Sequence, residues 1–306
     1  MATGGGVEIS VVIPVYNGAQ FIAAAIESAL SQSLKVLECI VIDDGSQDGT
    51  AEVADAFGPP VRVVRQPRQG VASARNRGIA LAGGTHVAFL DADDVWLPGK
   101  LERQLAALES AGARTTICGL FVTDLDLRIV GEQRGWIEGG LRGLLSFQYG
   151  GLCGSTLLAS RALLERVGGF DLRLSTSADW EILARLFLEG PVAVVEEPLA
   201  LYRKHGGNMH RNVAAMEHDM LLAFDAVFTD RRLDPTLKAD ERGYRAILHK
   251  ILSGSYYQAG CPGAAIRHAL RAVLLDPRSF SQLARGLVSG RRRSGSTPRV
   301  TRGIPR

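Results

Sequence analysis

The sequence predicts an α/β fold: a doubly wound, mostly parallel sheet with helices on both faces, followed by a helical C-terminal extension. Short apolar runs rich in branched residues alternate with amphipathic stretches from residue 9 onward. Asp, Gly, Ser or Pro follows most of these runs, and beyond residue 208 only helical periodicity continues. Strands and helices in strict alternation require right-handed crossovers, which produce a parallel sheet.

The first half of the chain alternates most clearly. Short apolar runs bounded by turn residues predict buried strands, and longer amphipathic stretches predict helices. In chain order we expect a strand at 9–13, a helix at 19–31, a strand at 37–42, a helix at 50–57, a strand at 61–65, a helix at 71–82, a strand at 86–90 and a helix at 100–110.

After residue 110 the alternation loosens, which indicates a mixed sheet. The expected elements are a strand at 116–122, a glycine-rich segment, a strand at 155–159, helices at 161–167 and 179–188, and strands at 192–195 and 199–202. We therefore predict three regions: an α/β domain at 1–207, a helical region at 208–289, and a basic, disordered tail at 290–306.

The helical region contains a repeat-like pattern. Tyr256, Gly260, Ala264 and Asp276-Pro277 are spaced as in one helix-turn-helix unit, and the pattern resembles a single tetratricopeptide repeat. Because one repeat cannot bury its own apolar face, we expect it to pack against the α/β domain. A surface for docking a partner is the alternative.

Charge and composition limit the functional classes. The chain has 306 residues, 46% of them hydrophobic, and a net charge of +3, which is too small to indicate nucleic-acid binding. The tail nevertheless carries Arg291, Arg292, Arg293, Arg299, Arg302 and Arg306 without an acidic residue. A solvated tail without function is the favoured interpretation, and weak attraction to an anionic membrane surface is the other.

Cysteine use and hydropathy indicate the compartment. Cys39, Cys118, Cys153 and Cys261 are far apart and show no C-x-x-C spacing, which favours free thiols in a reducing cytoplasm. The first six residues have neither a basic start nor an apolar core, so we expect no secretory signal. Glycines interrupt the longest uncharged stretch, 143–160, so we expect no transmembrane helix. A cytoplasmic protein, peripheral at the inner face of the membrane if the tail binds lipid, is the prediction.

Two acidic clusters follow expected strands: Asp43-Asp44-Gly45-Ser46 and Asp91-Ala92-Asp93-Asp94. Ligands of open α/β sheets bind outside the carboxyl ends of the strands. Carboxylates gathered there repel one another unless a cation or a set of donors compensates. Asp91 and Asp93 alternate along an extended chain and can share one hard cation, so we expect Mg²⁺ or Mn²⁺.

Three segments in this order resemble the family 2 glycosyltransferases of GT-A fold: Ile13-Pro14-Val15-Tyr16-Asn17, the run from Ile42 to Thr50, and Phe89-Leu90-Asp91-Ala92-Asp93-Asp94. The resemblance continues through Ala74-Arg75-Asn76-Arg77-Gly78, Gly168-Gly169-Phe170-Asp171, Ser177-Ala178-Asp179-Trp180-Glu181 and Tyr202-Arg203-Lys204-His205. It covers roughly the first two-thirds of the chain and implies that residues 1–207 form a nucleotide-sugar-binding and catalytic domain.

The resemblance implies an inverting, metal-dependent glycosyltransferase. It would move a sugar from a UDP-, GDP- or dTDP-linked donor to a hydroxyl of a glycan or lipid-linked acceptor, in cell-surface polysaccharide or glycoconjugate biosynthesis. The alternatives are a nucleotidyltransferase that forms nucleotide sugars, a phosphate-accepting receiver module, and a scaffold that binds nucleotide sugars without catalysis. A nucleotidyltransferase needs a basic, glycine-rich loop after the first strand, whereas this chain has no Lys or Arg before Lys35.

The implied nucleotide-sugar-binding residues are Pro14, Tyr16, Asn17, Asp43, Asp44, Arg75, Asp91, Ala92 and Asp93. Asp44 would accept the imino hydrogen of the base, which requires an ionised acid. A turn followed by a helix cap is the alternative, and it explains Asp48 and Gly49 better than Asp44. Arg75 would approach the diphosphate as a bidentate donor, or else be a solvated arginine on a helix surface.

The resemblance also implies the catalytic and metal-binding residues. Asp179 would be the base that removes the proton of the acceptor hydroxyl, and a plain helix cap is the alternative. Many relatives carry Glu before this acid, whereas this chain has Ala178. Asp93 would be the principal metal ligand, with Asp91 and His205; for His205 an exposed loop position is equally plausible. Either Asp91 or Asp94 would contact the ribose or a metal-bound water.

Overall fold

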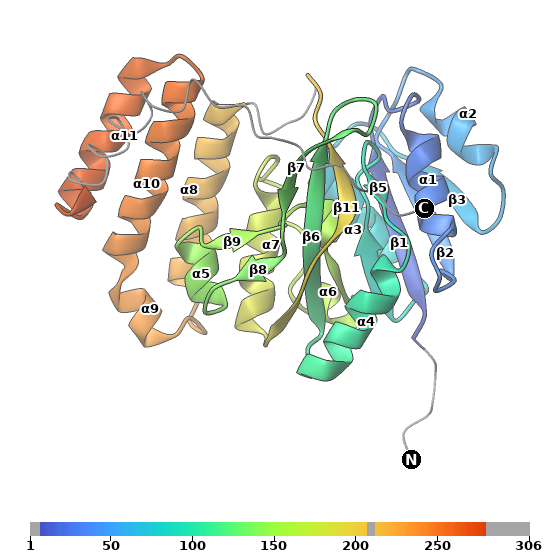
Figure 1. The fold of residues 1–306 in the computed structure, drawn as a ribbon, viewed down its shortest axis with the longest axis horizontal. Coiled ribbons are helices and arrows are strands. Elements are labelled where there is room, and N and C mark those ends of the chain that lie inside the picture. The colour runs from blue at the N-terminus through green and yellow to red at the C-terminus, as the bar shows by residue number, and fades with distance from the viewer. Residues whose placement is uncertain (1–6, 207–211, 280–306) are drawn as a thin grey trace. The chain divides into compact units, whose positions relative to one another are not determined.

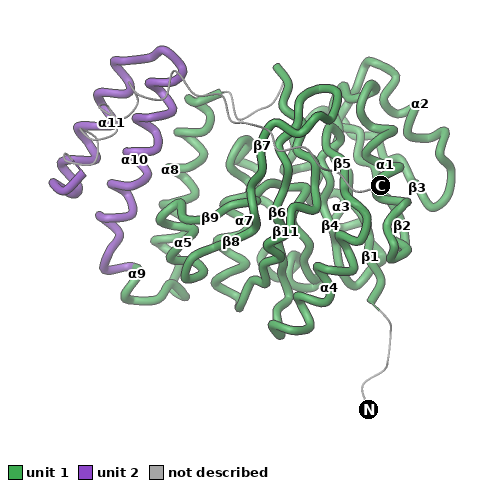
Figure 2. Tube along the Cα trace, in the orientation of Figure 1, with its two compact units in different colours: residues 1–237 green, residues 238–306 purple. Residues whose placement is uncertain are grey.

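The computed structural model describes residues 7–206 and 212–279 (Figure 1). The chain forms two compact units, residues 1–237 and 238–306 (Figure 2). The domain boundary predicted after residue 207 lies among residues 207–211, which are outside the described residues. The predicted tail, 290–306, is outside them as well. The three-region division therefore stays a prediction.

Parallel strands form one half of the main sheet. β1 (Ile9–Val15) pairs with β2 (Glu38–Asp43) and with β4 (His86–Phe89), and β2 pairs with β3 (Val61–Arg65), all in parallel. Since β2 and β4 flank β1 on opposite sides, the strand order reverses at β1. The carboxyl ends of strands at such a reversal form the crevice in which α/β proteins bind ligands.

The other half of the sheet is mixed. β6 (Thr115–Thr123) pairs in parallel with β11 (Val192–Arg203), while β10 (Leu158–Ser160) is antiparallel to both β4 and β6. β5 (Val95–Trp96) and β7 (Ile129–Gln133) are antiparallel to β11 and β6. Among the described residues the main sheet has nine strands in the order β3-β2-β1-β4-β10-β6-β11-β5, with β7 beside β6. The predicted fold class is confirmed.

Alternate residues of β1 face opposite layers of helices. Val11, Ile13 and Val15 belong to a core that also includes residues of α1 (Ile22–Leu30) and α4 (Lys100–Ala111). On the opposite face Val12 contacts α3 (Val71–Leu81) so closely that a Cβ at Gly78 would lie 2.2 Å from Val12 Cγ1. Glycine at this position lets α3 approach the sheet, and Arg75 lies one turn earlier on the same helix.

The remaining helices of the first unit are α2 (Thr50–Asp55), α5 (Leu141–Leu145), α6 (Arg161–Arg166), α7 (Ala178–Leu188) and α8 (Val213–Thr229). Of these, α2 contacts β2 and β3, α6 contacts β4 and β10, and α7 contacts α5 and α8. α7 packs against α8 through the parallel rings of Trp180 and Phe224, whose centroids are 5.1 Å apart. This stack fixes the helix that carries Asp179.

Several predicted elements differ from the observed ones. The strand expected at 155–159 is a 3-10 turn, Gly154–Thr156, followed by β10, because Thr156 Oγ1 accepts the Cys153 amide within the turn and Ser155 Oγ donates to Asp94, which is distant in sequence. The two strands expected at 192–195 and 199–202 are one strand, since a bulge at Pro198 absorbs the polar interruption. β5, β8 (Trp136–Ile137) and β9 (Tyr149–Gly150) were too short for a periodic signal, and β7 lacks a buried apolar face because most of its residues are exposed. The short helix α5 was not predicted either.

The second unit contains a helical hairpin, which confirms the predicted helical C-terminal part. α10 (Glu241–Gln258) buries Tyr244, Leu248, Leu252 and Tyr256, and α11 (Pro262–Leu275) buries Ala265 and Ala272. Between them Gly260 has φ +74° and Pro262 begins α11. α9 (Pro235–Ala239) spans the division between the units. Within the described residues no helix has the length and apolarity that crossing a bilayer requires.

Candidate active site

A cavity of about 710 Å³ opens at the carboxyl ends of β1 and β4. It is also lined by the start of α3, by the residues before and within the first turn of α7, and by the end of β11. The predicted site residues that line it are Pro14, Tyr16, Asn17, Asp44, Arg75, Asp91, Ala92, Asp93, Asp179 and His205. Asp43 is not part of the lining.

Asp43 is fully buried and holds the turn that follows β2. Its Oδ1 accepts a hydrogen bond from the Ser46 amide at 2.8 Å, and its Oδ2 accepts one from Arg65 Nε at 3.1 Å. Ser46 Oγ in turn accepts the Asn17 amide at 2.8 Å. Asp43 therefore does not face the cavity itself but holds the turn whose Ser46 positions Asn17 in the cavity wall.

Asp44 lines the cavity although most of the residue is buried. Its Oδ1 accepts hydrogen bonds from Gln66 Nε2 and the Gln69 amide, each at 2.8 Å, and its Oδ2 accepts the Gly70 amide at 2.7 Å. Three donors around one carboxylate fix its orientation.

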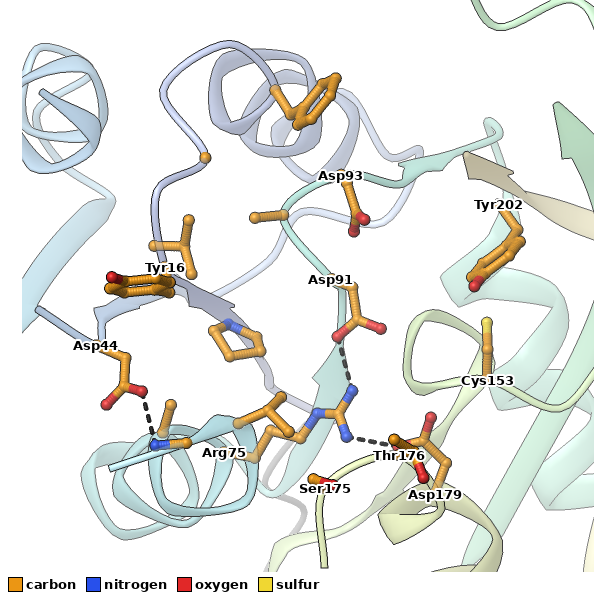
Figure 3. A pocket seen from close by; sticks show the side chains of 18 of the residues that line it. Tyr16, Asp44, Arg75, Asp91, Asp93, Cys153, Ser175, Thr176, Asp179 and Tyr202 are labelled. Atoms are coloured by element: carbon orange, nitrogen blue, oxygen red, sulfur yellow. Dashed lines mark hydrogen bonds and ion pairs between the residues drawn. The ribbon is translucent and has the colours of Figure 1, made fainter. Parts of the chain in front are cut away.

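Tyr16 forms a flat wall at the same end of the cavity. Its side chain is 38% exposed, and the guanidinium carbon of Arg68 lies 3.8 Å from the centre of its ring. Tyr16 and Asp44 lie near each other in Figure 3. A planar ring beside a fixed acceptor can hold a nucleobase by stacking and by its edge. Arg68 had no assigned role in the sequence.

Arg75 joins two acids that come from distant parts of the chain (Figure 3). Its Nη2 donates to Asp91 Oδ1 at 2.7 Å and its Nη1 donates to Asp179 Oδ1 at 2.5 Å. The side chain is only 3% exposed, so it is not a solvated arginine on a helix surface. Burial opposes the charge, but Asp179 and Asp91 outweigh it and raise the pKa of Arg75. The guanidinium is a permanent cation within the cavity wall.

Asp179 lies in the first turn of α7 and is 25% exposed. Ser177, and not Asp179, occupies the N-cap position, although an acid in the first turn also complements the helix dipole. Burial raises the pKa of Asp179, Arg75 opposes this rise, and the negative charge of Asp91 adds to it. A carboxyl of this kind accepts a proton more readily than a solvated one.

Asp93 faces the cavity from the loop after β4. Its Oδ2 lies 2.8 Å from Nε2 of His205, which follows β11. Burial and then the charge of Asp91 raise the pKa of Asp93, while the hydrogen bond with His205 opposes the rise. The structure thus brings together two of the three residues predicted to bind metal, although they are 112 positions apart in the sequence.

Asp94 differs from its neighbours because it is 1% exposed and lies outside the cavity lining. Its Oδ2 accepts Ser155 Oγ at 2.5 Å and its Oδ1 accepts the Arg203 amide at 3.0 Å. Ser155 Oγ also accepts the Asp91 amide at 3.0 Å. Asp94 therefore anchors the acidic loop to its surroundings, and of the two residues considered for the ribose only Asp91 lines the cavity.

Other residues that line the cavity had no predicted role. They are Leu120, Gln133, Leu152, Cys153, Ser175, Thr176, Tyr202 and Lys204. The motif Tyr202-Arg203-Lys204-His205 contained the signal for Tyr202 and Lys204, but only His205 was assigned. Burial raises the pKa of the Cys153 thiol well above its usual value, so the thiol stays neutral.

Divalent-metal binding can be tested against the available ligands. Within residues 7–206 and 212–279, no three His, Cys, Asp or Glu side chains are grouped as a metal site. Mg²⁺ in nucleotide enzymes is commonly held by one or two carboxylates, with substrate phosphates and water completing its shell. Asp93 with His205, and Asp91 beside them, fit an ion that the protein holds with few ligands while substrate phosphates and water complete its shell.

Comparison with protein families finds a match to the model for glycosyl transferase family 2 at residues 10–168. An uncharacterized glycosyltransferase of Rickettsia prowazekii is 32% identical over 203 residues, which cover 64% of this chain and 64% of that protein. The match thus spans about 64% of the length of that relative. The succinoglycan biosynthesis protein ExoO of Rhizobium meliloti is 30% identical over 94% of this chain and 86% of its own.

Solved structures show a similar fold. TarS of S. aureus, residues 1–349, superimposes with a TM-score of 0.62 at 16% identity, over 92% of each chain. The mannosyltransferase PcManGT of Pyrobaculum calidifontis, in complex with GDP-Man and Mn²⁺, has a TM-score of 0.62 at 18% identity, over 94% of this chain and 81% of its own. At these identities the similarity concerns the fold alone, and it agrees with the predicted one.

Proposed function

The chain belongs to glycosyl transferase family 2, and we propose that it transfers a sugar, with inversion, from a nucleotide-diphosphate donor to a hydroxyl of a glycan or lipid-linked acceptor. One observation carries the proposal. One cavity is lined by Tyr16 and Asp44 at one end, by Asp91 and Asp93 in the middle, and by Asp179 at the other side (Figure 3). The name of ExoO supports a role in polysaccharide biosynthesis.

The donor's nucleotide would occupy the end formed by Tyr16 and Asp44. Asp44 would accept the imino hydrogen of uracil, thymine or guanine, while Pro14 and Asn17 wall the base and the ribose. UDP-, GDP- and dTDP-sugars all carry such a hydrogen. TarS has been solved with UDP-GlcNAc and PcManGT with GDP-Man, which supports donors of this class.

The diphosphate would lie over Asp91, Ala92 and Asp93. A Mg²⁺ or Mn²⁺ ion held by Asp93, with His205 and Asp91, would neutralise charge on the leaving diphosphate. The Mn²⁺ in the PcManGT complex supports the use of a divalent ion. Arg75 is the fixed cation of the protein nearest to Asp91, so it can bind an oxygen of the diphosphate as well.

Asp179 would act as the catalytic base. As the acceptor oxygen attacks the anomeric carbon, the bond from that carbon to the diphosphate breaks and its electron pair leaves with the nucleotide. The proton of the acceptor hydroxyl passes to a carboxylate oxygen of Asp179. Attack from the side opposite the diphosphate inverts the anomeric centre.

Substitution of Asp179 tests this function. For Asp179→Asn we expect the turnover of donor to fall about 10²-fold to 10⁴-fold, since an amide cannot take the proton. Binding of UDP or GDP, measured by calorimetry with Mn²⁺, should stay within a few-fold of the unsubstituted protein. Unchanged turnover would refute the role of Asp179. A scaffold without catalysis would show donor binding but no turnover in the unsubstituted protein. A nucleotidyltransferase would release pyrophosphate when given a nucleoside triphosphate and a sugar 1-phosphate.

We further propose that the protein associates with the inner face of an anionic membrane through its second unit. On α11, Ile266, Leu270 and Leu274 are 60%, 61% and 76% exposed and form one stripe along the helix. Arg267 and Arg271 lie beside the stripe, and residues 280–306 contain seven arginines and no acidic residue. An apolar stripe bordered by arginines matches the acyl boundary and the negative headgroups of such a surface.

A further inference from the structure

Asp219 is a buried acid that the sequence did not single out. It lies on α8, far along the chain from the proposed catalytic residues, and is 2% exposed. One of its oxygens, Oδ2, accepts hydrogen bonds from the amides of Ser175, Thr176 and Ser177 at 2.8, 2.6 and 3.2 Å. The hydroxyls of Ser175 and Thr176 lie 3.2 and 3.1 Å from the same oxygen.

These contacts replace the usual cap of α7. Ser177 occupies the N-cap position, but its side chain makes no capping hydrogen bond. The carboxylate that meets the amides before the helix comes instead from α8. Hydrogen bonds from amides to an ionised acid are stronger than neutral ones, and an anion also complements the positive end of the helix dipole.

The segment held in this way borders the cavity. Ser175 and Thr176 line it, and Asp179 follows Ser177 by two residues (Figure 3). The direction of the Asp179 side chain depends on how the first turn of α7 begins. The stack of Trp180 on Phe224 fixes the distance between α7 and α8, so a carboxylate on α8 acts on this turn from a rigid support.

We infer that Asp219 is a positioning residue for the proposed base. It fixes residues 175–177 so that Asp179, together with Ser175 and Thr176 in the cavity lining, faces the incoming acceptor. The inference rests on the proposed function. It assigns no proton transfer to Asp219, which is not among the residues that line the cavity. Its effect on turnover therefore has to pass through Asp179 and through the segment 175–177.

A double-variant cycle tests this dependence. Turnover is measured as nucleotide release from UDP-glucose, UDP-N-acetylglucosamine and GDP-mannose with Mn²⁺ and with water as acceptor, using the donor that reacts fastest. Asp219→Asn should lower turnover at least 10-fold with little change in UDP or GDP binding. In the Asp179→Asn background the same change should have no further effect, because residues that act as a unit are not additive. Additive losses would overturn the inference.

Glu181→Gln is the matched control. Glu181 is equally buried but lies on α7, where its carboxylate pairs with Arg185 at 2.6 Å. Its backbone amide donates to the Ser177 carbonyl at 3.1 Å, and the substitution keeps this contact. A general loss of stability would affect both variants, whereas the proposed role predicts a turnover loss mainly for Asp219→Asn. Equal losses in the two variants would argue for a purely structural role.

Hydrogen exchange gives a readout that does not need turnover. In Asp219→Asn the amides of Ser175, Thr176 and Ser177 should exchange at least 10-fold faster than in the unsubstituted protein, and Glu181→Gln should leave them unchanged. Unaltered exchange in Asp219→Asn would overturn the inference even if sugar transfer is confirmed. If the unsubstituted protein releases no nucleotide while the exchange effect is present, the proposed function fails and the positioning contact stands.

Discussion

Arg75 determines how charge is distributed in the cavity. Its guanidinium lies between Asp91 and Asp179, and both contacts are at hydrogen-bonding distance. In the low dielectric of a buried site, two carboxylates without this cation would repel each other strongly. The same arginine thus allows a residue proposed to contact the donor and a residue proposed to activate the acceptor to be close together.

Lys100 is connected to the acidic loop 91–94 through Gln104 and the turn at Ser155, and it provides a test of pH dependence. It is fully buried, donates to Gln104 Oε1 at 2.6 Å and lies 4.1 Å from the Trp96 ring centre. Gln104 in turn donates to the Thr156 carbonyl, next to Ser155. Burial lowers the pKa of Lys100 from 10.5 to about 8.

We predict that the free energy of unfolding rises with pH relative to that of Lys100→Met. Between pH 8 and 10.5 the unfolded chain holds a proton on Lys100 that the folded chain has lost, so deprotonation favours the folded state. From pH 7 to pH 9.5 the difference should change by about 2 kcal/mol in favour of the unsubstituted protein. Urea unfolding of both proteins at the two pH values measures it. A constant difference would mean that Lys100 titrates normally.

At the scale of the elements, the approach of α3 to β1 gives Arg75 its place. A Cβ at position 78 would lie 2.2 Å from Val12 Cγ1 and 2.8 Å from Val12 Cγ2. Gly78→Ala should therefore push α3 from the sheet and lower the free energy of unfolding by about 1–3 kcal/mol. Turnover should fall as well, because Arg75 lies one helical turn away. Thermal unfolding and nucleotide release measure the two effects.

Two further variants separate this effect from helix propensity. Adding Val12→Ala to Gly78→Ala removes both clashing methyl groups and should restore part of the lost stability. Gly254→Ala on α10, where nothing lies within 4 Å of the added Cβ, should instead stabilise by about 0.5–1 kcal/mol. If Gly78→Ala behaved like Gly254→Ala, the packing of α3 on β1 would not be tight.

The sequence predicted elements well where periodicity is long and local. The strand 61–65 is observed with the same limits, and the other strands of the parallel half differ by no more than two residues at either end. The turn at Ser155 was missed because its structure depends on Asp94 and Asp91, whose hydrogen bonds to Ser155 join residues more than 60 positions apart. Asp219 was missed for the same reason.

The cavity was predictable in its residues but not in its contacts. Asp44, Asp91, Asp93 and Asp179 all line it, since motifs at strand ends and helix starts fix their place. The sequence could not show that Arg75 joins Asp91 to Asp179, because this contact depends on how closely α3 packs. It also could not separate Asp94 from Asp93, because adjacent residues of one loop face opposite environments.

In the second unit, α11 exposes an apolar stripe that has no part in the proposed sugar transfer. Burying the apolar stripe of α11 and drawing its arginines to anionic headgroups would each favour binding, the latter by about 1 kcal/mol for each arginine near the surface. The two contributions differ in their response to salt. Only the electrostatic part is screened at high ionic strength.

We predict that the protein co-sediments with vesicles containing phosphatidylglycerol at low salt and binds phosphatidylcholine vesicles at least 10-fold more weakly. Leu270→Gln with Leu274→Gln should weaken binding to the anionic vesicles about 10-fold or more, since two exposed leucines no longer enter the acyl boundary. Leu172→Gln is the control, because Leu172 is 67% exposed on the first unit and should not matter. Equal binding by all three proteins would exclude α11 as the contact. If the double variant instead converts a dimer to a monomer in size-exclusion chromatography, the stripe serves a second copy of the chain and the membrane proposal fails.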